Sequence, residues 1–251
     1  MWTAWSWYRY LRSEQFELHL AVDGELPEVE TEAVQRLFPG IQIYSVETVI
    51  GSLRASLPVL EALMNKHPLG RKLVLILAMS QQNAILYSDH DVLAFNPPDE
   101  LLACVEHETP CYMAEEHEGN SDPAIVERCK SLGVEYISRF NSGLLYVPKG
   151  ALAADLAVQV LSTWKPPANS WFTEQTVLGV LMRRASASPL PKDRYVVSAR
   201  RQFYWEKDVN YSAIVARHFT GTVRHVMYRY GMPAVLRQSK ASWVSEFDTA
   251  Q

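Results

Sequence analysis

The chain has 251 residues, 48% of them hydrophobic and 21% charged, so it can bury a full core and has the composition of an ordinary globular protein. The net charge of −4 provides no basic field for a nucleic-acid backbone, which argues against nucleic acid as a partner. The longest apolar run, Leu73 to Met79, is far shorter than the roughly 20 residues of a membrane-spanning helix, so no transmembrane segment is expected.

The cysteines indicate the compartment. Cys104, Cys111 and Cys129 form neither a C-x-x-C pair nor an even set for disulfides, which favours a reducing environment, and we expect a cytoplasmic protein. The Cys and His residues between positions 104 and 117 also fit no standard spacing of a structural zinc site.

The first twelve residues contain five aromatic side chains and lack the features of a signal peptide. We predict a helix that docks on the domain through its aromatic side. A peripheral contact with a membrane or a partner is the alternative interpretation, since aromatic and Arg side chains suit such surfaces.

The first third of the chain alternates between strand and helix patterns. The predicted elements are a strand over Leu18–Val22, a helix over Val29–Phe38, a strand over Ile41–Val46, a helix over Leu53–Met64, and a buried helix over Arg71–Ser80. A buried strand then begins at Ala84 and runs into Asp89.

Beyond residue 95 the alternation continues and then becomes irregular. We predict helices over Asp99–Glu106 and Asp122–Leu132 with an acidic, His-containing loop between them, a strand over Leu144–Val147, helices over Ala151–Trp164 and Thr173–Arg184, short strands over Arg194–Val197, Gln202–Trp205 and Ser212–Val215, and a closing helix over Tyr228–Gln238. This order predicts a single α/β domain over residues 1–251, with a mostly parallel sheet covered by helices on both faces.

The most informative motif is Asp89-His90-Asp91, which follows an apolar strand directly. A strand that ends in Asp-x-Asp can present two carboxylates at the carboxyl edge of an α/β sheet, where such folds place ligands. Carboxylates there can hold a divalent cation that bridges phosphate oxygens. Because neighbouring strand residues point to opposite faces, His90 is not counted as a ligand.

A Mg²⁺-dependent phosphatase shares this local pattern, with one aspartate as nucleophile and the next as general acid. That chemistry also needs a downstream acidic pair for its magnesium ion. Every aspartate after Asp91 stands alone, which argues against the phosphatase.

Three later segments carry further polar residues: Asn141-Ser142-Gly143, Glu174-Gln175, and the segment from His218 through Gly221 to Arg224. Each also has a structural explanation. The first suits a turn before a strand, Glu174 suits the first turn of a helix, and His218 suits a hydrogen-bonded core position.

In this order the motifs resemble those of nucleotide-sugar-dependent glycosyltransferases of the GT-A fold, most nearly the family 8-like members, from about residue 5 to residue 232. The resemblance implies a Rossmann-like GT-A fold and a metal site made by Asp89, Asp91 and His218. It implies donor-binding roles for Asp89, Asn141, Ser142, Gly143 and Gly221. It also implies that the catalytic groups are Glu174, Gln175 and Arg224.

The implied activity is transfer of a hexose from a nucleoside-diphosphate sugar, with UDP expected, to an unidentified glycan, lipid or protein acceptor in the presence of Mn²⁺ or Mg²⁺. A metal ion and a guanidinium next to the leaving diphosphate suit this chemistry, because negative charge builds there. Retention of anomeric configuration follows only from the family 8 likeness. A remnant that binds nucleotide sugars without turnover is the alternative.

Three features depart from the family pattern. Glu174-Gln175 lacks the following acidic residue that some family members carry, which leaves open the group that faces the sugar. Arg224 stands where the family has lysine, which keeps the charge and adds a bidentate geometry. We expect the chain to begin, at Met1-Trp2-Thr3, in the helix that follows the family's first nucleotide-binding strand, which leaves nucleotide choice and donor affinity open.

Overall fold

The computed structural model describes residues 1–11, 16–54, 58–67, 69–165, 171–197 and 209–238. Its helices are α1 (Trp2–Tyr8), α2 (Glu28–Leu37), α3 (Val46–Arg54), α4 (Pro58–Lys66), α5 (Gly70–Gln82), α6 (Asp99–Glu106), α7 (Pro123–Leu132), α8 (Ala154–Leu161), α9 (Thr173–Arg184) and α10 (Arg224–Val226). A 3-10 turn (Gly221–Val223) precedes α10, a π-helical turn (Met227–Gly231) follows it, and residues 232–238 are helical.

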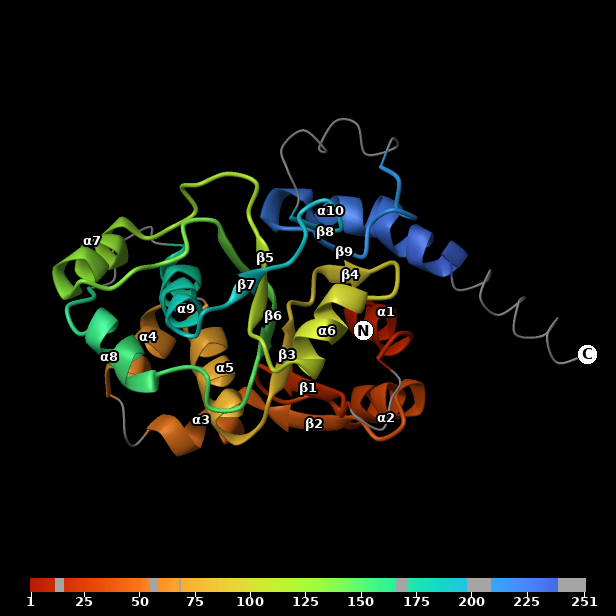
Figure 1. Ribbon diagram of the computed structural model, residues 1–251. Helices are drawn as coiled ribbons and strands as arrows, with labels where there is room; N and C mark the ends of the chain where they lie inside the picture. The colour runs from red at the N-terminus through yellow and green to blue at the C-terminus, as the bar shows by residue number, and fades with distance from the viewer. Residues whose placement is uncertain (12–15, 55–57, 68, 166–170, 198–208, 239–251) are drawn as a thin grey trace, which may run out of the picture.

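The described strands are β1 (His19–Val22), β2 (Gln42–Ser45), β3 (Ile85–Ser88), β4 (Val92–Ala94), β5 (Cys111–Ala114), β6 (Phe140–Val147), β7 (Ser188–Pro189), β8 (Tyr195–Val197) and β9 (Ala216–His218). They form three sheets with the orders β1-β2, β3-β6-β5-β7 and β4-β9-β8. In Figure 1 the four-stranded sheet lies in the middle, with α5 and α9 on one side and α6 on the other. Helices therefore cover both faces of this sheet, as the α/β prediction requires.

The sheet is mixed, and the expectation of a mostly parallel sheet was wrong. Both β3 and β5 run antiparallel to β6, while β7 runs parallel to β5. The backbone N–H of Glu115 donates to the carbonyl of Arg139, so the chain re-enters the sheet where it left after β5. Because α7 and its loops bring the chain back to the same end, β6 must run in the reverse direction.

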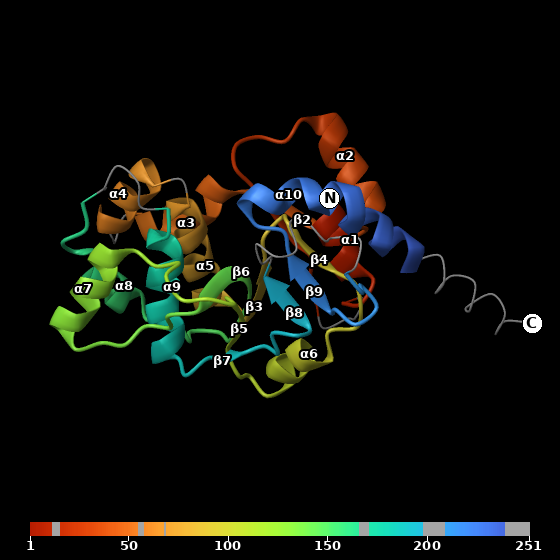
Figure 2. The same cartoon turned by 90° about the horizontal axis from the view of Figure 1, so that it is seen from above.

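The largest apolar cluster lies between the four-stranded sheet and the helices α3, α4, α5, α8 and α9, which Figure 2 shows gathered on one side. In α5, every residue from Leu73 to Ala78 is buried, which explains why the sequence there is apolar almost all round. This packing fixes α5 against β3, just ahead of the Asp-x-Asp turn. Among the described residues, no helix combines the length and apolar character that crossing a bilayer requires.

Several predicted elements are confirmed, including α6, α9 and the docked helix α1. In α7, Asp122 caps the N-terminus through a hydrogen bond from the backbone N–H of Ala124, and Gly133 ends the helix in the left-handed conformation with φ 66°. The predicted strand over Gln202–Trp205 lies outside the described residues.

Other predicted elements need correction. The single helix over Leu53–Met64 is two helices, α3 and α4, and Pro58 begins the second because proline suits a first helical turn. The loop between α6 and α7 contains β5, which is buried on both faces and therefore shows no alternation.

The strand predicted over Ser212–Val215 lies later, as β9. Residues 210–213 instead form a turn in which the Asn210 side chain accepts hydrogen bonds from the backbone N–H and hydroxyl of Ser212.

Candidate metal and donor site

The two aspartates of the motif lie in the tight turn between β3 and β4. The backbone N–H of Asp89 donates to the carbonyl of Gly143 at 2.7 Å, and the N–H of Val92 donates to the carbonyl of Asp89 at 3.1 Å. These bonds tie the turn to β6 and hold both carboxylates at the same end of the sheet. Asp91 is 3% exposed, so its charge needs nearby partners.

His218 reaches the same place through the ladder between β4 and β9. Val92 lies opposite His218 in this antiparallel pair, and the backbone N–H of Phe219 donates to the carbonyl of Asp91 at 2.9 Å. The Nε2 atom of His218 lies 3.1 Å from Oδ1 of Asp91 and 3.8 Å from Oδ2 of Asp89. A residue 127 positions beyond Asp91 in the chain is thus brought into contact with it.

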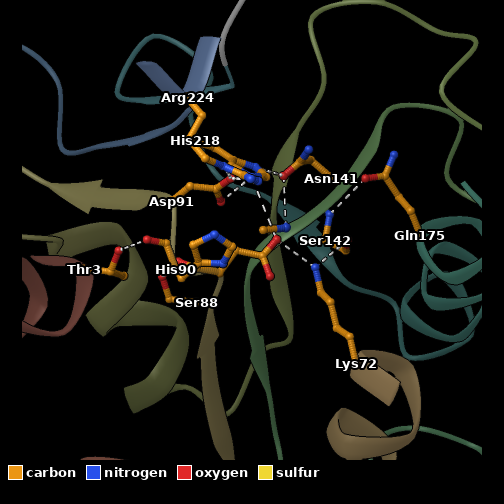
Figure 3. Close-up of polar contacts among 12 residues, drawn as sticks. Thr3, Lys72, Ser88, His90, Asp91, Asn141, Ser142, Gln175, His218 and Arg224 are labelled. Atoms are coloured by element: carbon orange, nitrogen blue, oxygen red, sulfur yellow. Dashed lines mark hydrogen bonds and ion pairs between the residues drawn. The ribbon is translucent and has the colours of Figure 1, made fainter. Parts of the chain in front are cut away.

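These three side chains fit a divalent cation. Asp89, Asp91 and His218 each offer one ligand atom, and these atoms lie within 4.8 Å of one another. Two carboxylates and one imidazole leave positions for phosphate oxygens and water, and the imidazole suits Mn²⁺ better than Mg²⁺. The three predicted metal ligands therefore lie together, and Figure 3 shows His218 directly beside Asp91.

A β-bulge in β6 shapes the neighbouring wall of the site. Tyr112 of β5 pairs with Leu145, but the next residue, Met113, pairs with Asn141, so Ser142, Gly143 and Leu144 have no partners on β5. Bulges redirect side chains and occur next to active sites. This irregularity coincides with the predicted Asn-Ser-Gly motif.

Gly143 provides the space that the imidazole of His218 occupies. A Cβ atom at this position would lie 2.3 Å from Nδ1 and 2.5 Å from Cε1 of His218. Any larger residue would therefore displace the ring, so the motif requires glycine here for close packing.

Asn141 contacts the same edge of the His218 ring. Its Oδ1 lies 2.8 Å from Nδ1 of His218 and accepts a hydrogen bond from the backbone N–H of Gly143 at 3.0 Å, while its Nδ2 donates to Glu115 at 2.8 Å. The predicted donor-binding residue thus contacts a candidate metal ligand directly.

Lys72 belongs to the site although the sequence analysis did not single it out. Its ammonium donates to Oδ2 of Asp89 at 2.8 Å and to the hydroxyl of Ser142 at 3.0 Å, and it lies 3.6 Å from Glu174. Burial alone would lower the pKa of Lys72, but the negative charges of Asp89 and Glu174 outweigh it and raise that pKa. The signal was the pair Arg71-Lys72 at the start of the mostly apolar helix α5, in which the side chain of Lys72 is 10% exposed and that of Arg71 is 37% exposed.

Glu174 and Gln175 lie in the first turn of α9, behind Lys72 and the bulge. Glu174 is 1% exposed and accepts a hydrogen bond from the Ser142 hydroxyl at 3.3 Å. Burial raises the pKa of Glu174, and Lys72 opposes this shift. The side chain of Gln175 accepts from the N–H of Ser142 at 3.4 Å and donates to the carbonyl of Asn120 at 3.1 Å.

Arg224, the first residue of α10, also contacts Asp91. Its Nε and Nη2 atoms donate to Oδ2 of Asp91 at 3.1 and 2.8 Å (Figure 3). Burial favours protonation of Asp91, but the hydrogen bonds from His218 and Arg224 outweigh it and hold the pKa of this carboxyl well below its usual range. Gly221 begins the 3-10 turn ahead of α10 with φ 34°, and no atom lies within 4 Å of the place that a Cβ would take.

Helix α1 supports the turn from behind. The Trp7 indole donates to the hydroxyl of Ser88 at 3.0 Å, the Thr3 hydroxyl donates to the carbonyl of His90, and the Ser6 hydroxyl accepts from the N–H of Ala94. The N-terminal helix therefore holds the motif through its polar side chains as well as through aromatic packing.

Comparisons with known proteins give a match at the level of structure. No protein-family model and no curated protein sequence matches this chain. The crystal structure of mouse xyloside xylosyltransferase 1 in its apo form aligns with a TM-score of 0.50 and 14% identity, over 88% of this chain and 91% of that one. The alignment confirms the α/β fold class of the GT-A type that was expected from the sequence.

Proposed function

We propose that this protein is a metal-dependent glycosyltransferase that moves a hexose from a nucleoside-diphosphate sugar, with UDP as the nucleotide. The observation that carries the proposal is the meeting of Asp89 and Asp91 with His218 from a distant strand, next to the guanidinium of Arg224. A three-ligand site with a neighbouring cation suits a substrate that carries two phosphates.

Cleavage of a sugar–phosphate bond leaves negative charge on the departing diphosphate. A bound Mn²⁺ would supply Lewis acidity at these phosphate oxygens, and Asp89, Asp91 and His218 are the residues that would hold it. Arg224 is 44% exposed at its side chain, so its guanidinium can turn from Asp91 to the leaving diphosphate. Gly221, with open space beside it, would let the backbone approach the phosphates.

The sugar would lie against the bulge of β6. Ser142 and Gly143 form this wall, with Asn141, Glu174 and Gln175 around it. One oxygen of Glu174, Oε1, is buried without a hydrogen bond within the described residues, although it faces Lys72. A sugar hydroxyl is a donor of the kind that this oxygen lacks.

The structural neighbour is a xylosyltransferase, which supports a sugar-transfer activity for this protein. The family 8 likeness, the hexosyltransferase class, retention of configuration and the Mn²⁺ preference rest on the motifs and the ligand types. A glycan, lipid or protein acceptor, one domain, and a cytoplasmic location with or without peripheral membrane contact stay predictions from the sequence.

The test is calorimetric titration of the wild-type protein with UDP and Mn²⁺, together with release of UDP from UDP-sugars. We expect UDP to bind only when Mn²⁺ is present and UDP-sugars to be hydrolysed slowly without an acceptor. Asp89→Asn should lose both properties, whereas His90→Asn should keep them, because His90 is exposed and lies outside the ligand set.

The same experiment separates the alternatives. Binding of UDP and Mn²⁺ without any UDP release would support the non-catalytic remnant. Turnover of a generic phosphate ester with Mg²⁺, lost in Asp89→Asn, would support the phosphatase. Absence of Mn²⁺ binding by the wild type would reject the metal site and the proposed function.

A further inference from the structure

Glu115 lies one residue beyond the end of β5 and contacts the site indirectly. Its backbone N–H donates to the carbonyl of Arg139 at 2.8 Å, which fixes its place next to the start of β6. Its carboxylate accepts a hydrogen bond from Nδ2 of Asn141 at 2.8 Å. Glu115 is outside the three-residue ligand set, so its contribution must pass through Asn141.

This contact determines which end of the Asn141 amide faces His218. An ionised carboxylate only accepts hydrogen bonds, so the NH₂ group of Asn141 must face Glu115. The backbone N–H of Gly143 only donates, so the oxygen of Asn141 must face Gly143, at 3.0 Å. Both neighbours select the same orientation, in which Oδ1 lies 2.8 Å from Nδ1 of His218.

The orientation of the amide in turn determines which nitrogen of His218 carries hydrogen. Oδ1 of Asn141 is an acceptor, so Nδ1 of His218 must be the donor in this hydrogen bond. Nε2 faces Asp91 and Asp89, and without a cation it is the nitrogen that donates to Asp91. It is therefore the nitrogen that can release its hydrogen and offer a lone pair to a cation. Hydrogen bonds of this kind fix the tautomer and ring orientation of metal-binding histidines.

We propose that Glu115 is a positioning residue for the metal site, which acts through the Asn141 amide to keep Nδ1 of His218 hydrogen-bonded and Nε2 directed at the cation. This inference rests on the metal site of the proposed function. It assigns a role to a residue that the sequence motifs do not include.

The experiment uses two variants of similar length at position 115. Glu115→Met keeps the side chain's reach but removes its carboxylate acceptor, whereas Glu115→Gln keeps an oxygen that accepts from Asn141. Mn²⁺ affinity is measured by electron paramagnetic resonance on the full chain. We expect about a 10- to 100-fold weaker affinity for Glu115→Met and an affinity near that of the wild type for Glu115→Gln, since loss of outer-shell partners has effects of this size.

Glu116→Ala is the matched control, because Glu116 is the next residue, is half exposed, and makes its ion pair with the exposed His117. It should leave Mn²⁺ affinity unchanged. Should circular dichroism show Glu115→Met unfolded, Glu115→Ala takes its place with the same expectation.

A spectroscopic measurement separates this role from general loss of structure. The ¹⁵N resonances of His218, recorded with Zn²⁺ as a diamagnetic probe, should show hydrogen on Nδ1 in the wild type and in Glu115→Gln, and a loss of that state in Glu115→Met. Mn²⁺ affinity of folded Glu115→Met within twofold of the wild type overturns the role of Glu115 alone. Absence of Mn²⁺ binding by the wild type overturns the proposed function with it.

Discussion

The two halves of β6 are equally buried but differ in what they contact. From Leu144 to Val147 the strand pairs without interruption with β3, and its side chains are apolar or aromatic and at most 3% exposed. The half from Asn141 to Gly143 leads into the bulge relative to β5, and its groups hydrogen-bond to His218, Lys72, Glu174 and Asp89.

The comparison shows what the bulge achieves. In a regular strand, consecutive side chains point to opposite faces, so three neighbours cannot all contact one site. Here Asn141, Ser142 and Gly143 are consecutive, and each contacts a residue of the candidate site. The regular half of β6 contributes packing, while the bulged half contributes polar contacts to the metal site.

The largest expected effect comes from Asp91→Asn. Asp91 contacts His218, which the bulged half of β6 holds through Asn141. Loss of a ligand and its charge should abolish measurable Mn²⁺ binding and slow UDP-sugar hydrolysis by about 1,000-fold, since metal charge stabilisation is worth several kcal/mol. Both are measured against His90→Asn as the control. Unchanged Mn²⁺ affinity in the folded variant would contradict the ligand role of Asp91.

Leu145→Ala probes the regular half instead. Leu145 is fully buried, so its truncation should lower the free energy of unfolding by about 2–5 kcal/mol, measured by urea denaturation. Mn²⁺ affinity should stay within about twofold of the wild type at temperatures where the variant is folded, because Leu145 belongs to the apolar core and is outside the ligand set. If affinity falls in parallel with stability, the two halves of β6 are not separable in this way.

Gly143→Ala should weaken Mn²⁺ binding by about 10- to 100-fold, because the added methyl group would displace the ring of His218 as an outer-shell change does. Gly51→Ala is the matched control, since Gly51 lies in α3 with no atom within 4 Å of an added Cβ, and it should stabilise the protein by up to about 1 kcal/mol. Isothermal titration with Mn²⁺ measures the effect on binding. Equal affinities of the two variants would show that the close packing of Gly143 has no role in the site.

The smallest expected effect is that of Arg224→Lys in the absence of nucleotide. The pair between Arg224 and Asp91 competes with a cation for the carboxylate, and an ion pair to a partly exposed guanidinium contributes up to about 1 kcal/mol. Mn²⁺ alone should therefore bind about 2- to 5-fold more tightly to the variant. UDP in the presence of Mn²⁺ should bind more weakly, and an unchanged Mn²⁺ affinity would show that Arg224 does not compete.

Sequence patterns predicted the parts of this molecule that depend on local physics. The periodicity of α9, the capping residues of α7 and the strand before Asp89 all follow from residues close together in the chain. The metal ligands were predicted by resemblance, and their proximity in the structure agrees with it.

The parts that the sequence did not predict depend on long-range pairing. The direction of β6 follows from where the chain re-enters the sheet. Strand β5 was not predicted because both of its faces are buried, so its sequence does not alternate between polar and apolar residues. Lys72 and Glu115 carry no motif, and their relevance follows only from contacts with residues that lie 17 and 26 positions away in the chain.

The hydrogen bonds from α1 to the Asp-x-Asp turn have a consequence for when the site forms during folding. Thr3 and His90 are 87 positions apart, and Trp7 and Ser88 are 81 apart. During synthesis α1 emerges well before the turn that it supports, and contacts between distant residues form late because closing long loops costs entropy. The carboxylate turn should therefore be among the last regions to become rigid, and a nascent chain would acquire cation affinity only after its beginning has docked.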